Sequence, residues 1–289
     1  MTNFVGQQLI KTGWVQGTYL FCKDLPSDFY QICWASSKEL HENLESQLKD
    51  ARNILILISQ DCDIAAKSES EKSIEFVIAR KPKKNNPPHF LNLDARSSRF
   101  LELKLSDNFW YKAEAAKIIQ IVKEDFFRQG LSPQNLDQEQ IDVLKRWRAN
   151  RYVRTGLPDK FNEKIKPLIE QHIFDTGLED AGSLYINLEP SSESENYSVR
   201  LFALHRKGSS PETFDGLDEK MQEIIEKIND IEGLMCPFIE GEENEEFETI
   251  RPAMRRDEVN MEQLDYFVRW NFDYLSLSNA DNEGIDNDV

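Results

Sequence analysis

The chain has little cysteine and no long apolar run. Its four cysteines, Cys22, Cys33, Cys62 and Cys236, are widely spaced and form no C-x-x-C pair. We therefore expect reduced thiols, and neither a disulfide framework nor a zinc site. The longest apolar run, around residues 54–58, has about six residues at most, whereas a membrane helix needs about 20. No basic segment followed by an apolar one opens the chain, so no secretory signal is expected. These absences indicate a cytoplasmic protein.

Several common catalytic signatures are also missing. The sequence has no Gly-rich phosphate loop, no G-x-S-x-G nucleophile elbow and no H-E-x-x-H pair. Most nucleotide-binding, hydrolase and zinc-protease functions are therefore disfavoured.

Charge is abundant and unevenly distributed. The net charge of −17 argues against a general nucleic-acid binder, because contact with phosphates needs local positive potential. However, residues 145–166 contain eight Lys or Arg and two acids, while residues 240–289 contain fifteen acids and four arginines. Residues 80–84 form a second basic cluster. One interpretation is solvated surface whose opposite signs meet in the fold; the other is a patch that faces a polyanion, flanked by acidic segments.

The periodicities predict an α+β protein. Aromatic and β-branched segments at 17–22 and 29–34 suggest a hairpin, and further strands are expected at 53–59, 73–80 and 99–105. Apolar residues at helical spacing predict helices over 37–50, 137–147, 158–173 and 217–231. Strands at 183–188 and 197–204 and a late strand from 266 complete the pattern. We expect an SH3-like or β-barrel-like half over residues 1–130, then a helical middle and a C-terminal α+β half with an acidic segment over residues 131–289.

The best candidate site follows the apolar run, where Gln60, Asp61, Cys62 and Asp63 come in succession. As alternate residues of an extended segment, Asp61 and Asp63 would point the same way and could hold one Mg²⁺ or Mn²⁺ ion. Alternatively, Cys62 could be a nucleophile or a soft-metal ligand, if positive charge stabilised its thiolate. The third interpretation is structural, with the aspartates capping turns through backbone N–H groups.

A metal-dependent nuclease is one chemistry that this segment could support. Glu102 and Lys104 form a Glu-x-Lys pattern on a predicted later strand. In such nucleases the carboxylates hold the metal and the lysine assists the attacking water. Asp61, Asp63, Glu102 and Lys104 are therefore the candidate catalytic residues.

A second cluster joins two predicted helices. Arg148, Arg151 and Arg154 could contact a phosphate or carboxylate while Tyr152 stacks on a base. With Gln60 they form the candidate substrate-binding set. Alternatively, the arginines pair with the abundant acids, for which Asp61 or Asp63 is an obvious partner.

These two segments together resemble a family of uncharacterised bacterial proteins. Its members have a strand that ends in S/T-Q-D-C-D, as at residues 59–63, and a later R-Y-x-R-P-A-F-P-D-x-F-N-like motif after a tryptophan, as at residues 147–162. The resemblance covers roughly residues 14–175, although Thr155-Gly-Leu stands where P-A-F is usual. Such proteins often look like parts of bacterial conflict or defence loci. More remotely, residues 17–20 and 54–59 are similar to the opening of PemK-like ribonucleases, which are small SH3-like barrels.

Three functions remain open from the sequence. The first is an intracellular bacterial or phage defence protein that acts as a metal-dependent nuclease or phosphohydrolase on nucleic acid or nucleotide, with Mg²⁺ or Mn²⁺. The second is a non-catalytic sensor or adaptor whose acidic C-terminal surface meets a protein partner. The third is an acidic phage inhibitor of a host nucleic-acid enzyme.

Overall fold

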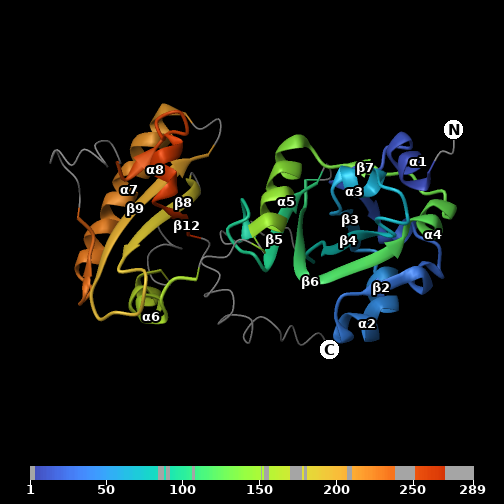
Figure 1. The fold of residues 1–289 in the computed structure, drawn as a ribbon, viewed down its shortest axis with the longest axis horizontal. Coiled ribbons are helices and arrows are strands. Elements are labelled where there is room, and N and C mark those ends of the chain that lie inside the picture. The colour runs from blue at the N-terminus through green and yellow to red at the C-terminus, as the bar shows by residue number, and fades with distance from the viewer. Residues whose placement is uncertain are drawn as a thin grey trace. The chain divides into compact units, whose positions relative to one another are not determined.

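The computed structural model divides into two compact units, Met1–Val153 and Arg154–Val289 (Figure 1). It describes residues 4–83, 88, 92–105, 108–150, 152, 156–169, 178, 181–206, 210–237 and 251–270. Each unit has its own sheet and helices. The predicted α+β class is confirmed.

The first unit is built on a seven-stranded antiparallel sheet in the order β2-β6-β4-β3-β1-β7, with β5 also paired to β6. Its strands are β1 (Thr18–Phe21), β2 (Cys33–Ala35), β3 (Asn53–Leu57), β4 (Ser73–Arg80), β5 (Phe100–Lys104), β6 (Trp110–Val122) and β7 (Gln134–Asn135). The long strand β6 pairs with β4 along one edge. Its other edge pairs with β5 at residues 110–114 and with β2 at residues 119–121.

Both faces of this sheet are buried. Leu55 and Leu57 of β3 pack in one core with side chains of α1 (Val5–Lys11), α2 (Lys38–Lys49), α3 (Asp61–Ala65) and α4 (Lys123–Arg128). Ile54 and Ile56 point into a second core, which α5 (Gln138–Asn150) covers (Figure 1). Because successive side chains of a strand point to opposite faces, β3 can be apolar at every position from Ile54 to Leu57.

This arrangement differs from the barrel expected for the first half. The pairing order leaves β2 and β5 at one end and β7 at the other, and no pairing among the described residues joins these ends. The expected hairpin is also wrong: β1 pairs with β3 and β7, and β2 pairs with β6. Short 3-10 helices, η1 (Cys22–Asp24) and η2 (Phe29–Ile32), occupy much of the segment between them.

Capping explains where two helices of this unit begin. The Ser37 side chain accepts a hydrogen bond from the Leu40 N–H at the start of α2, and Asp137 accepts from the Gln140 N–H at the start of α5. Since α5 packs on the first sheet through Leu144 and Trp147, it belongs to the first unit. The unit therefore extends to Val153, beyond the boundary at residue 130 that the sequence suggested.

The second unit has a five-stranded sheet in the order β10-β9-β8-β12, with β11 also paired to β9. Its elements are α6 (Asp159–Leu168), β8 (Ala181–Glu189), β9 (Tyr197–His205), α7 (Pro211–Asn229), β10 (Leu234–Met235), β11 (Ala253–Met254), α8 (Met261–Asp265) and β12 (Val268–Arg269). The predicted strands at 183–188 and 197–204 form an antiparallel pair. Of the late strand predicted from residue 266, only β12 lies within the described residues. In the part of the chain that the structure describes, no helix is both long and apolar enough to cross a membrane.

Candidate functional site

Asp61, Cys62 and Asp63 lie in the short helix α3, and Gln60 is its N-cap. This corrects the expectation that the segment is extended. Residues two apart on a helix are rotated by about 200° around its axis, so Asp61 and Asp63 do not share a direction as they would on a strand. One argument for a two-aspartate metal site is thereby removed.

Contacts from distant residues hold α3 in place. The backbone N–H of Gln16 donates to Asp61 Oδ1 at 2.7 Å, and the Gln16 side chain donates to the Ile58 carbonyl at 2.9 Å. The fully buried Lys123, the first residue of α4, donates hydrogen bonds from its ammonium group to the backbone carbonyls of Asp63 and Ala66. Burial lowers the pKa of Lys123, although nearby carboxylates oppose this shift. Asp61 therefore has a contact that links α3 to the backbone of Gln16, rather than a cap on its own turn.

The candidate nuclease residues do not come together. Across the sheet, Glu102 of β5 pairs with β6, β6 pairs with β4 and β4 pairs with β3, so that Glu102 lies level with Asn53, the first residue of β3. Asp61 lies beyond the other end of β3, so the length of the strand alone separates Asp61 from Glu102 by about 13 Å. Across the sheet the two residues are also separated by three interstrand spacings of about 4.8 Å each. Glu102 accepts a hydrogen bond from Asn92, and Lys104 is exposed. Among the described residues no group of three or more His, Cys, Asp or Glu could hold a metal ion.

The two sequence motifs are instead connected through Glu75 of β4. The backbone N–H of Glu75 donates to the Ser59 hydroxyl at 2.8 Å, immediately before Gln60. Its carboxylate accepts a hydrogen bond from the Arg148 guanidinium, and the side chain of Arg148 is only 18% exposed. Arg148 thus pairs with an acid, but that acid is neither Asp61 nor Asp63. Arg151 and Arg154 lie outside the described residues.

Five side chains extend this connection across the first unit, and we call them the Trp–Tyr row: Trp34, Gln120, Glu75, Arg148 and Tyr152. Trp34 lies opposite Gln120, and Gln120 lies opposite Glu75, so all three share one face of the sheet. The Gln120 amide donates to Glu75 at 3.0 Å. The guanidinium carbon of Arg148 lies 5.5 Å from the centre of the Tyr152 ring.

The ends of the Trp–Tyr row are unusually exposed. Trp34 is 70% exposed and Tyr152 is 72% exposed. Aromatic rings bury large apolar areas when they are covered, and leaving them in water forgoes that stabilisation. Trp, Tyr and Arg are also the residues that contribute most often to the binding energy of protein interfaces. The row therefore has the composition of a binding surface.

The cysteines fall into two groups. Burial raises the pKa of Cys22, Cys33 and Cys236 to about 12, so these thiols stay protonated at neutral pH. Cys62 is exposed on α3, where its sulfur lies 3.5 Å from an Asp63 oxygen and 3.6 Å from the Gln60 amide oxygen. These neighbours supply no positive charge that would favour a thiolate. All four are free thiols in the structure.

No family model matches the chain, and comparisons with curated proteins and with solved structures also give no match.

The sequence contained a signal for part of the Trp–Tyr row. Glu75 interrupts an otherwise apolar strand between Ile74 and Phe76. A charged residue in a strand that is covered on both faces needs a partner, and this could have pointed to an arginine. Trp34 and Gln120 carry no such signal, because their exposure depends on which strands pair.

Proposed function

We propose that the protein is a non-catalytic adaptor or sensor that binds a protein partner through the Trp–Tyr row. The observation that carries this proposal is the exposure of Trp34 and Tyr152 on either side of a hydrogen-bonded Gln120–Glu75–Arg148 chain. Hydrogen bonds hold the central side chains in place, which reduces the entropy lost on binding. The resemblance to an uncharacterised bacterial family, whose members often look like parts of conflict or defence loci, supports a partner from such a locus.

The geometry favours binding over metal-dependent catalysis. Asp61 accepts a backbone hydrogen bond, Arg148 is paired with Glu75, and Glu102 lies at the opposite end of the sheet from α3. Residues 240–250, the acid-rich start of the C-terminal segment that was expected to meet a partner, lie outside the described residues. The proposal assigns recognition to the first unit because the exposed Trp34 and Tyr152 belong to it.

Site-specific photocrosslinking in host cells tests this proposal. A photoreactive benzoylphenylalanine replaces Trp34 or Tyr152, and the matched control carries it at Phe127, a 36% exposed aromatic on α4. We expect one protein adduct shared by the first two positions and absent from the third. No adduct, or the same adducts at all three positions, would contradict the proposal.

The purified partner then allows a quantitative measurement. Because interface hot spots contribute about 2 kcal/mol or more, Trp34→Ala and Tyr152→Ala should each weaken binding about 30-fold or more. Both substitutions remove exposed side chains, so the melting temperature should hardly change. Asp61→Asn should leave the affinity unchanged. If Mg²⁺ or Mn²⁺ instead raises the melting temperature and Asp61→Asn abolishes that rise, a metal-dependent enzyme becomes the better explanation.

A further inference from the structure

The other end of the first sheet carries a concentration of positive charge. Register places Arg80 of β4 opposite Lys112 of β6, and β5 adds Lys104 opposite Trp110. Neighbouring positions along β3, β4 and β5 contribute further cations. We call this set the basic end: Arg52, Arg80, Lys81, Lys83, Arg99, Lys104 and Lys112.

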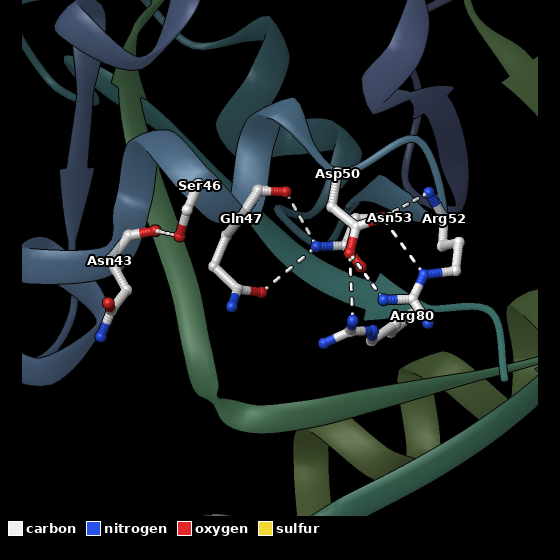
Figure 2. A network of polar contacts seen from close by, with 7 residues as sticks. All are labelled: Asn43, Ser46, Gln47, Asp50, Arg52, Asn53 and Arg80. Atoms are coloured by element: carbon white, nitrogen blue, oxygen red, sulfur yellow. Dashed lines mark hydrogen bonds and ion pairs between the residues drawn. The ribbon is translucent and has the colours of Figure 1, made fainter. Parts of the chain in front are cut away.

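Few acids offset these seven cations. Asp50 binds both Arg52 and Arg80, at 3.1 and 3.0 Å (Figure 2). Glu102 and Glu114 are the other carboxylates in this part of the sheet. Seven cations against three acids give +4, whereas the whole first unit, with 22 Lys and Arg against 20 Asp and Glu, has only +2. Lys84 and Asp107, which adjoin the set in sequence, lie outside the described residues and have opposite charges.

Aromatic rings accompany the cations. The Lys81 ammonium lies 3.4 Å from the centre of the Phe109 ring, and the Lys112 ammonium lies 4.3 Å from that of Phe100. Both rings are partly exposed, as is Trp110. Surfaces that bind single-stranded nucleic acid combine cations, which follow the phosphates, with aromatic rings, on which bases stack. Lysines also lie over aromatic rings elsewhere in the first unit, so the pairing alone does not mark a ligand site; the basic end differs in combining such pairs with an excess of cations.

We propose that the basic end binds single-stranded nucleic acid. Arg80 and Lys112 on one face of the sheet, and Lys81 on the other, contact phosphates, while Phe100 and Phe109 offer faces for bases, so the nucleic acid passes around the end of the sheet. The overall charge of −17 does not oppose this, because the second unit, with 13 Lys and Arg against 32 Asp and Glu, has a charge of −19 and contains the whole excess of acid. This surface and the Trp–Tyr row are separate, so either function can fail while the other stands.

Fluorescence anisotropy with labelled oligonucleotides of about 16 nucleotides tests the proposal, using the full chain and single-stranded DNA, single-stranded RNA and duplex DNA. The test variant is Lys81→Glu/Lys112→Glu. The control, Lys38→Glu/Lys72→Glu, makes the same charge change at two exposed lysines, one at the start of α2 and one just before β4, at the far end of that strand from Arg80.

We expect the wild type and the control to bind at least one single strand more tightly than the duplex, and the test variant to bind it about tenfold or more weakly. In the test variant the slope of log affinity against log salt should be smaller in magnitude by about 1.4 than in the wild type. Each phosphate contact on a single strand contributes about 0.7, and the variant removes two. Lys81→Gln/Lys83→Gln, which avoids placing a carboxylate beside Glu102, should also weaken binding if the first variant is unstable. Absence of binding, equal loss in the control, or preference for the duplex would overturn the proposal.

Discussion

A single carboxylate, Asp50, connects the end of α2 to two strands of the first sheet. One of its oxygens accepts from the Arg52 backbone and side chain, and the other accepts from Arg52 and Arg80 (Figure 2). Burial alone would raise the pKa of Asp50, but the hydrogen bonds and charge of Arg52, with the charge of Arg80, lower it below its ordinary value. The ionised form is therefore favoured by folding.

Asp50→Asn should lower the free energy of unfolding by about 1–2 kcal/mol at pH 7, a modest amount because the side chain is about a quarter exposed. A carboxyl group with a depressed folded pKa stabilises the protein above its unfolded pKa, near 3.9, and loses this effect as the pH falls through the folded value. The difference between wild type and variant should therefore be constant above about pH 5 and shrink below pH 4. Urea unfolding between pH 3 and 7 checks this. The exposed Asp28→Asn serves as the control, and an equal loss there would contradict the role given to Asp50.

At the scale of elements, α1 and α3 approach so closely that only glycine fits between them. A Cβ atom at Gly6 would lie 2.3 Å from the Ile64 carbonyl oxygen and 2.6 Å from that of Ala66. Since both are backbone atoms, Gly6→Ala must displace α1, and we expect a loss of about 1–3 kcal/mol. Gly216 of α7 has open space around its Cβ position. Gly216→Ala should therefore stabilise its helix by up to about 1 kcal/mol. Thermal melts of both variants measure these effects, and a neutral Gly6→Ala would show that α1 is not held against α3.

The elements also show how far local sequence determines this fold. Leu40, Leu44 and Leu48 predict α2, and all three are buried against the sheet. By contrast, residues 112–117 of β6 are Lys-Ala-Glu-Ala-Ala-Lys, residue types that are depleted in strands, yet β6 pairs along both edges with β4, β5 and β2. Its conformation depends on partners distant in the sequence, which no local window contains.

The candidate site was harder to predict for the same reason. An extended and a helical conformation of residues 61–63 are both compatible with the local sequence. Gln16 and Lys123, respectively 45 and 60 residues from their partners in α3, hold the helical one. Similarly, the sequence identified the two motifs that meet in the Trp–Tyr row, but Glu75, which connects them, lies on a strand that neither motif includes.

At the scale of the whole molecule, charge divides between the two units. The first has +2 and the second −19, so the second experiences much stronger self-repulsion. Salt screens such repulsion, because the Debye length falls from about 30 Å at 0.01 M to about 8 Å at 0.15 M. Raising the salt over this range should therefore increase the melting temperature of the second unit by a few degrees, since about 1 kcal/mol corresponds to about 4 °C for a unit of this size. The first unit should hardly respond. Scanning calorimetry of the full chain measures the unfolding transitions of both units. Gly6→Ala should lower the melting temperature of the first unit only, which shows which transition belongs to which unit. Equal shifts of the two transitions, or a shift confined to the first unit, would contradict the view that net charge limits the stability of the second.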